Sequence, residues 1–243
     1  MTLEQIKIET DKLLLRINNK YKIPDLWHIL RCKENFRCHS RFCPECSNIR
    51  SKRTYGKVLA LIKRIREKNK TAKFFFVTLG ALPVQREQLG EHYKKISLAC
   101  TNLLAGSKQL KKTKLIKKYM LGYIKMIEVK YNSADNTFNV HVHAVIAVKS
   151  SYKKSQCYIN ITKWKKIWQD LLKVAYIPDV KQKEIKENFT ENIATIAGYG
   201  TKGICLTVAS IQNYDDENIE DMKVFMQVIK KKRLISYGGI FKS

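Results

Sequence analysis

The chain has 243 residues, 44% of them hydrophobic, which is enough apolar material for one large domain or a domain with a small appendage, and excludes a disordered basic tail. Lys and Arg number 47 against 21 Asp and Glu, a formal net charge of +26 that favours a polyanionic partner, nucleic acid first among them. No apolar run approaches the roughly 18 residues of a membrane span, and residues 1–10 carry charges. We therefore expect a soluble cytoplasmic protein with neither a transmembrane segment nor a secretory signal.

Hydrophobic periodicity predicts strands interleaved with helices, and hence an α+β fold with an antiparallel sheet. Helices are expected at 3–17, 47–69, 86–104, 162–172, 190–202 and 216–230, and strands at 73–79, 121–131, 137–148 and 180–185. The turn-rich run 132–136 predicts a hairpin between the second and third strands. In the first helix the residues expected to be buried are Leu3, Ile6, Leu13, Leu14 and Ile17. The Lys-rich run 108–118 is expected to be a surface connection.

Four of the 7 cysteines lie close together near the N-terminus: Cys32, Cys38, Cys43 and Cys46. An odd number of cysteines without an export signal favours a reducing cytosol over a disulfide framework. The Cys-Pro-Glu-Cys turn aims two thiolates at one ion, and the other two cysteines can complete a tetrahedral structural zinc site, with His39 as a spare ligand. The alternative is a set of reduced thiols packed under a basic loop.

The helix expected after this cluster has one apolar stripe, formed by Val58, Leu61, Ile62 and Ile65. Most of the remaining surface is Lys and Arg, which suits either a solvated face or contacts with DNA phosphates. The residues predicted to bind DNA are Arg50, Lys52, Arg53 and Lys57.

The third expected strand carries two histidines, His141 and His143, on one face, whereas every residue from Phe138 to Val148 on the other face is apolar. Residues two apart on a strand have Cα atoms about 6.5–7 Å apart, so both imidazoles can reach one cation. Glu128 on the partner strand is expected beside them, and two imidazoles with one carboxylate suit Mg²⁺ or Mn²⁺ acting on a phosphodiester. The alternatives are two half-buried, hydrogen-bonded structural histidines and a Glu128 paired with a lysine across the strands.

With these residues in place, the chain resembles the HUH endonucleases, and more closely the replication initiators (Rep proteins) of small rolling-circle plasmids. The resemblance covers about residues 30–243 and rests on ordered blocks: CHSRFCPEC, FFFVTLG, GYIKMIEVKYN, FNVHVHAVIAV, WKKIWQDLL, AGYGTKG and KKKRLISYGGIFKS. It implies a central antiparallel sheet of the RRM or ferredoxin-like type flanked by helices, with an N-terminal zinc-binding appendage. Residues 1–70 would form the appendage and the basic helix, and residues 71–243 the nicking domain.

The resemblance also implies metal-dependent nicking and rejoining of one strand of plasmid origin DNA, at a single-stranded or hairpin site. The nucleophile would be Tyr199, which forms a 5′-phosphotyrosyl link and leaves a 3′-OH for a host polymerase, with a host helicase as a further partner. Lys202, one helical turn later, can favour the phenolate. Many initiators of this kind have a Glu four residues before the tyrosine, and Thr195 stands there, so a termination mechanism does not follow.

Two other functions fit the sequence less fully. One is a zinc-dependent DNA-binding regulator without catalysis, which would use the cysteine cluster and the basic helix. The other is a single-tyrosine HUH transposase, which shares the chemistry and acts on hairpin ends. The N-terminal cysteine block together with KKKRLISYGGIF favours initiation.

Overall fold

The computed structural model describes residues 2–23, 26–32, 36–105, 118–186, 189–199 and 215–242, although the side chains of Trp27 and Tyr199 are outside the description. Its helices are α1 (Leu3–Tyr21), α2 (Leu26–Leu30), α3 (Pro44–Lys68), α4 (Arg86–Ala105), α6 (Ile161–Leu172), α7 (Thr190–Tyr199) and α9 (Asp216–Ile229), with a 3-10 helix at Ser150–Lys154. The strands are β1 (Lys73–Leu79), β2 (Met120–Asn132), β3 (Thr137–Val148), β4 (Val180–Ile185) and β5 (Ile235–Gly239).

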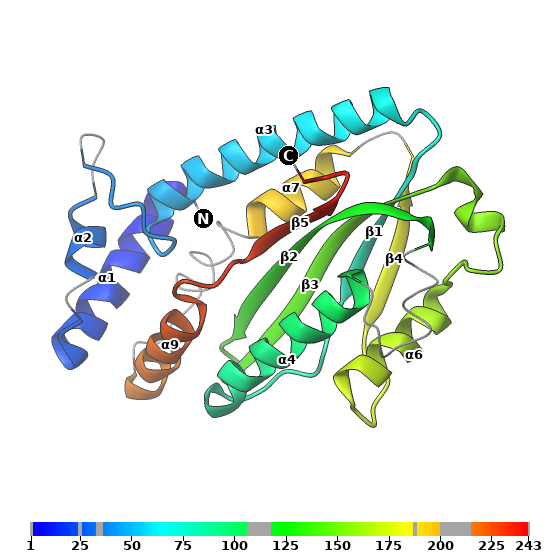
Figure 1. Ribbon diagram of the computed structural model, residues 1–243. Helices are drawn as coiled ribbons and strands as arrows, with labels where there is room; N and C mark the ends of the chain where they lie inside the picture. Colours follow the sequence, from blue (N-terminus) through cyan, green and yellow to red (C-terminus); the bar gives the residue numbers. More distant parts are fainter. Residues whose placement is uncertain are drawn as a thin grey trace.

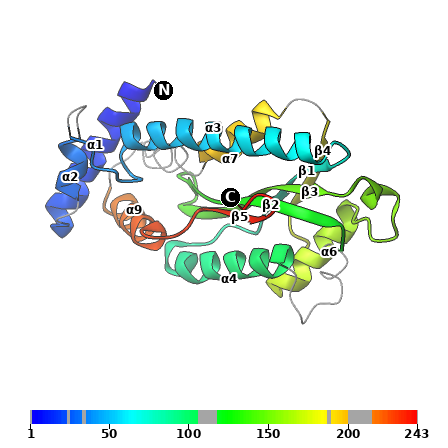
Figure 2. The same ribbon diagram turned by 45° about the horizontal axis from the view of Figure 1, so that its top comes forward.

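The five strands form one antiparallel sheet in the order β4-β1-β3-β2-β5. Helices α3 and α7 cover one face, and α4 and α6 cover the other (Figures 1 and 2). The chain order β1-α4-β2-β3-α6-β4, with β1 and β3 in the centre, is that of ferredoxin-like folds. The predicted α+β class and antiparallel sheet are therefore confirmed, and β5 adds a strand beside β2.

Strand β3 divides the interior into two hydrophobic clusters because its side chains alternate between the faces of the sheet. Its apolar series, from Phe138 to Val148, is buried with residues of α4, α6 and α9. On the opposite face Val145 and Ala147 are buried with residues of α3 and α7. The two histidines continue this second face, which we call the histidine face, beyond Val145.

The apolar stripe of α3 is buried as predicted, with Val58 and Ile62 among its members, and it packs in the same cluster as Phe74 of β1 and Ile124 of β2. The N-terminal part of the chain also shares a cluster with the sheet, since Leu13 and Leu14 of α1 are buried together with strand residues. The division into units at residue 70 stays a prediction.

Most elements expected from the sequence are present with small shifts in their bounds, and the hairpin at 132–136 is confirmed, with Asn136 in the left-handed region at φ 51°. One expectation is wrong: Leu3 is 37% exposed, because it lies in the first turn of α1 and the buried face of the helix begins at Ile6. The short helix α2, the 3-10 helix and β5 were not predicted. Residues 106–117 and 200–214 lie outside the described residues, so the Lys-rich connection up to residue 117 and the end of the 190–202 helix stay predictions.

The outer strand β4 carries charge on both of its faces. Lys181 and Lys183 are exposed opposite Thr78 and Phe76 and therefore belong to the histidine face. On the other face Glu184 forms ion pairs with Lys153 at 2.8 Å and Lys73 at 3.6 Å. Only Val180 and Ile185, at the two ends of the strand, are buried.

Candidate metal centres and the histidine face

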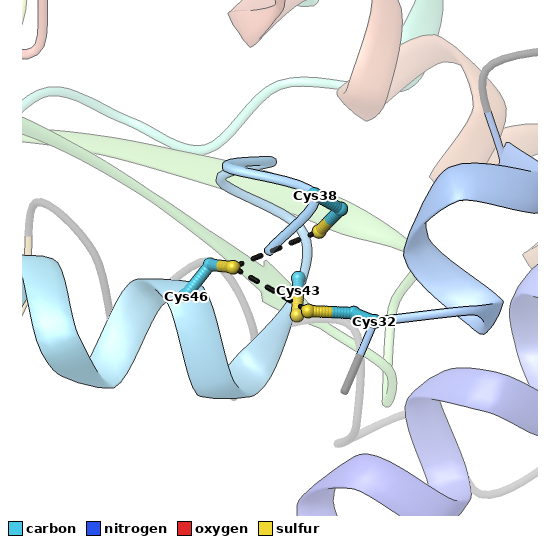
Figure 3. Close-up of side chains that lie close together, drawn as sticks. All are labelled: Cys32, Cys38, Cys43 and Cys46. Atoms are coloured by element: carbon cyan, nitrogen blue, oxygen red, sulfur yellow. Dashed lines mark hydrogen bonds between the residues drawn. The ribbon is translucent and has the colours of Figure 1, made fainter. Parts of the chain in front are cut away.

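Four cysteine sulfurs converge where the N-terminal segment meets α3 (Figure 3). Cys43 is the N-cap of α3, Pro44 occupies the first turn where its missing N–H costs nothing, and Cys46 follows one turn later. The Sγ atom of Cys46 lies 3.6 Å from that of Cys32 and 3.7 Å from that of Cys38. All four sulfurs lie within 4.8 Å of one another, and no other group of three or more potential ligands in the described residues is so compact.

These distances fit a tetrahedral zinc ion. Zinc–sulfur bonds of about 2.3 Å at tetrahedral angles place the sulfurs about 3.8 Å apart. Burial raises the pKa of the Cys38 thiol to about 12 and also raises that of Cys43. Burial raises the pKa of Cys32 as well, but hydrogen bonds from the Cys38 backbone and the other thiols outweigh it and lower that pKa. Buried thiols of this kind need a cation before all four can ionise. The group could therefore hold a metal ion such as zinc, as predicted.

The loop between Cys38 and Cys43 is held by hydrogen bonds from two arginines. It also carries His39, which was predicted as a spare zinc ligand. His39 is exposed in the left-handed region at φ 53°, and its side chain is not part of the sulfur group. Its carbonyl accepts a hydrogen bond from Arg50 at 2.7 Å. Arg41 donates to the carbonyls of Ile229 and Lys232 at 2.8 and 2.9 Å, which places a cation at the C-terminal end of α9.

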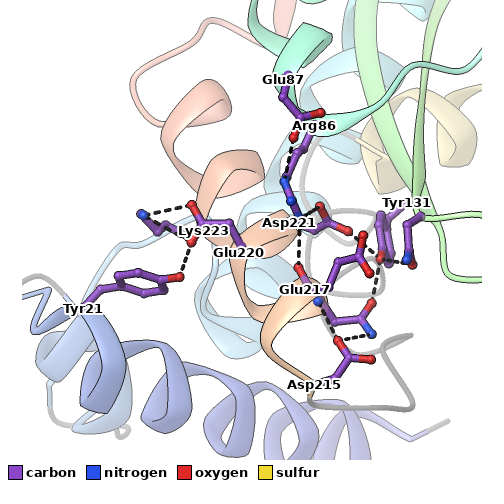
Figure 4. A network of polar contacts seen from close by, with 11 residues as sticks. Tyr21, Arg86, Glu87, Tyr131, Asp215, Glu217, Glu220, Asp221 and Lys223 are labelled. Carbon is purple, nitrogen blue, oxygen red and sulfur yellow. Dashed lines mark hydrogen bonds and ion pairs between the residues drawn. The ribbon is translucent and has the colours of Figure 1, made fainter.

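Helix α9 in turn joins the N-terminal helix to the sheet through a network of polar side chains (Figure 4). Tyr21 of α1 donates a hydrogen bond to Glu220, which also pairs with Lys223 at 2.9 Å. The next residue of α9, buried Asp221, pairs with Arg86 of α4 at 3.1 Å. Its second oxygen lies 2.8 Å from the Tyr131 hydroxyl of β2. The cysteine site is thereby tied to the edge of the sheet through one helix.

The hairpin of β2 and β3 brings the predicted acidic ligand to the histidines. Glu128 lies directly opposite His141 in the register of the two strands. Its Oε2 atom is 2.9 Å from Nε2 of His143, and its carboxylate is buried. The rings of His141 and His143 have centroids 6.2 Å apart. The three residues predicted as catalytic metal ligands are thus neighbours on the histidine face.

The chemistry of this donor set suits a divalent cation. Oε1 of Glu128 is buried and has no hydrogen bond among the described residues, although Nζ of Lys130 lies 3.5 Å away. Lys130 is on the same strand as Glu128, so this contact differs from the cross-strand lysine pair considered as the alternative. Burial lowers the pKa of His141, against the attraction of Glu128, and the nearby His143 and Lys130 lower it further. A neutral imidazole is the form that binds metal. His143 Nε2 points at Glu128, so both side chains must give up this hydrogen bond to share an ion.

Helix α7, which ends at Tyr199, lies over the same face of the sheet. Phe189, just before it, packs edge-to-face on Phe74, and Arg66 of α3 lies 4.1 Å from the Phe189 ring centroid. Near the other end of α7 the Ala197 carbonyl accepts a hydrogen bond from Ser51 at 3.1 Å. The helix therefore runs antiparallel to α3, with Tyr199 at the end far from Phe74.

The remaining predicted residues are placed as follows. Lys202 lies outside the described residues. Thr195, which stands where many initiators have Glu, donates its hydroxyl to the Glu191 carbonyl at 2.9 Å. Among the predicted DNA-binding residues on α3, Lys52, Arg53 and Lys57 are exposed, whereas Arg50 is half-buried on the cysteine loop.

Comparison with known proteins places this basic α+β protein, with its ferredoxin-like sheet and cysteine centre, in a family. A family model described as replication protein (Rep_1) matches residues 29–243, and the chain therefore belongs to the Rep family of replication proteins that its ordered motifs predicted. No solved structure matches the chain significantly. None of the described helices is long and apolar enough to cross a lipid bilayer.

Three curated relatives illustrate the similarity. "Protein rep" of Lentilactobacillus hilgardii is 28% identical over 217 residues, which is 88% of this chain and 67% of the relative. "Protein rep" of Lactiplantibacillus plantarum is 30% identical over 217 residues, which again is 88% of this chain and 67% of the relative. "Protein rep" of Streptococcus pneumoniae is 28% identical over 220 residues, 88% of this chain and 63% of the relative. The chain thus spans about two thirds of the length of these relatives.

Proposed function

We propose that this protein initiates plasmid replication by nicking one strand of origin DNA with HUH-type chemistry. The observation that carries the proposal is the arrangement on the histidine face: Glu128 is opposite His141 and bonded to His143. Membership of the replication protein family supports the choice of DNA as substrate. The excess of positive charge supports it as well, because phosphate contacts supply much of the affinity for DNA.

The proposed division of labour follows from the chemistry of each side chain. His141, His143 and Glu128 would hold Mg²⁺ or Mn²⁺, which when bound polarises the scissile phosphate as a Lewis acid. The phenol oxygen of Tyr199 attacks phosphorus, the bond to the 3′-oxygen breaks, and the phenol proton is lost as the 3′-oxygen gains one. Lys202 favours the phenolate. Because the phosphotyrosyl bond conserves the energy of the phosphodiester, the reverse reaction rejoins the strand.

The free 3′-OH would prime a host DNA polymerase, with a host helicase separating the strands ahead of it. Zinc at the four cysteines would have a structural role, because the four sulfurs leave no coordination position open for substrate. The exposed cations of α3 would contact phosphates and orient the protein on the origin without reading its sequence.

The decisive experiment incubates the protein with single-stranded origin DNA and Mn²⁺, then locates any covalent adduct by mass spectrometry. We expect an adduct on Tyr199 in the wild type and in a Tyr55→Phe control, and none in Tyr199→Phe. An undiminished adduct in Tyr199→Phe refutes the assignment of the nucleophile.

The same experiment separates the alternatives. A non-catalytic zinc-dependent regulator would form no adduct and would bind the origin equally well after His141→Ala. A transposase would cleave hairpin ends without requiring a plasmid origin, which substrate mapping would reveal.

A further inference from the structure

The end of strand β1 contacts both histidines of the histidine face. The β1 residue Thr78 is opposite His143 in the register of β1 and β3, and its Oγ1 lies 3.2 Å from Nδ1 of His143. Two residues further on, Gly80 lies against His141. Neither residue was predicted to be functional, although both belong to the sequence block FFFVTLG.

The hydroxyl of Thr78 can serve both protonation patterns that His143 requires. Nε2 of His143 faces Glu128, and because a carboxylate only accepts, a neutral His143 ring would carry its proton on Nε2 and accept from the Thr78 hydroxyl at Nδ1. To bind a metal through Nε2, a neutral ring must lose that proton to water and take one up at Nδ1. The Nδ1–H then donates to the oxygen of Thr78, as ligating histidines usually donate their second N–H to a fixed partner. A hydroxyl can reverse its role without moving.

Gly80 leaves the space that the ring of His141 occupies. A Cβ atom added at Gly80 would lie 3.2 Å from Cδ2 of His141 and 3.3 Å from the carbonyl oxygen of Asp179. The Gly80 backbone cannot easily retreat, because its N–H donates to the Asp179 carbonyl at 2.8 Å. Its own carbonyl accepts a hydrogen bond, also of 2.8 Å, from the indole N–H of Trp168.

We propose that Thr78 and Gly80 are positioning residues for the two histidines of the histidine face. Thr78 fixes the orientation of the His143 ring, and Gly80, held in place by Trp168 of α6, fixes the ring of His141. This inference rests on the proposed metal site. It also gives a role to the tryptophan-bearing helix on the opposite face of the sheet, which anchors a turn that contacts a metal ligand.

The test of Thr78 compares Thr78→Val, which keeps the shape and removes the hydroxyl, with Thr78→Ser, which keeps the hydroxyl. Mn²⁺ affinity is measured by electron paramagnetic resonance on the full-length protein without DNA. We expect Thr78→Val to weaken Mn²⁺ binding by about 10–100-fold, the usual effect of losing the partner of a ligating histidine, and Thr78→Ser to restore most of it. Equal affinity of Thr78→Val and wild type would overturn the role of Thr78.

A second measurement on the metal-free protein keeps this inference separate from the proposed function. The ¹⁵N chemical shift of His143 Nδ1 reports the hydrogen bond from Thr78 directly. We expect it to change in Thr78→Val and to be preserved in Thr78→Ser. If the wild type binds no Mn²⁺ and forms no DNA adduct, the proposed function fails, whereas an unchanged Nδ1 shift in Thr78→Val refutes the contact on which this inference depends.

The test of Gly80 uses Gly80→Ala with Gly56→Ala as its matched control, since a Cβ at Gly56 on α3 would have nothing within 4 Å. A displacement of a few tenths of an ångström at one ligand should weaken Mn²⁺ binding about threefold to tenfold, whereas Gly56→Ala should leave it unchanged. Trp168→Phe, which removes the indole N–H donor together with part of the buried ring volume, should weaken binding in the same direction. Wild-type affinity in Gly80→Ala would show that this glycine does not position His141.

Discussion

Replacing one cysteine of the N-terminal cluster should destabilise the protein through loss of zinc. The sulfur–sulfur distances of 3.6 and 3.7 Å are close to the roughly 3.8 Å of a tetrahedral zinc–thiolate site, so Cys46→Ser removes a ligand that is already in position. Zinc at about 1,000 times its dissociation constant stabilises the folded state by about 4 kcal/mol. For a chain of this size, about 1 kcal/mol shifts Tm by about 2–4 °C. We therefore expect Tm to fall by roughly 8–16 °C.

The assay is differential scanning calorimetry combined with zinc analysis of the purified protein, with and without a chelator. Cys157→Ser is the matched control, because Cys157 is a free half-buried cysteine outside the cluster. We expect one zinc per chain in the wild type and the control, and little in Cys46→Ser. A wild type without zinc, or equal Tm values for the two variants, would refute the reasoning and leave reduced, packed thiols as the correct interpretation.

Three further predictions concern pH, the α9 network and the basic helix. Burial raises the pKa of Cys38 to about 12 and also raises that of Cys43, so zinc binding must release the protons of both thiols. Zinc affinity, measured by competition with a chelator, should therefore rise by at least about 100-fold per pH unit near neutrality, and a pH-independent affinity would contradict this. Tyr131→Phe should lower the free energy of unfolding in urea by about 1–3 kcal/mol, because the Tyr131 hydroxyl lies within hydrogen-bonding distance of buried Asp221 and Asn218. Tyr21→Phe, which removes the half-buried partner of Glu220, should lower it less; equal losses would mean that the Tyr131 hydroxyl does not satisfy the buried network. Alanine at the three exposed cations Lys52, Arg53 and Lys57 should lower the slope of log K against log salt for duplex origin DNA by up to about 2.7, and an unchanged slope would exclude phosphate contacts by this helix.

The sequence was sufficient for the features that depend on local periodicity. The alternation of β3 predicted both the buried apolar face and the histidine face, and the stripe of α3 predicted its buried residues. The hairpin was also local, so Glu128 could be placed beside the histidines before the structure was known.

Contacts that depend on the order of the strands in the sheet could not be predicted from local periodicity. Thr78 contacts His143 only because β1 pairs with β3 across about 65 residues of chain, and nothing within β1 indicates that partner. The same is true of β5, five residues long, which is stabilised as a strand by its pairing with β2. The prediction that Leu3 is buried was wrong for a local reason, because periodicity alone does not show where the buried face of a helix begins.

The charged outer strand β4 has a consequence for how molecules of this protein meet one another. An exposed strand edge can pair with the edge of another molecule and begin aggregation, and lysines along it oppose such pairing by mutual repulsion. Lys181 and Lys183 lie on that edge and face the side of the sheet that carries the histidines. The same two charges that keep two copies from joining edge to edge would attract a DNA backbone. Bound DNA would neutralise these charges and remove the repulsion between two β4 edges. Copies of the protein should therefore associate most readily when many of them are crowded on one nucleic acid.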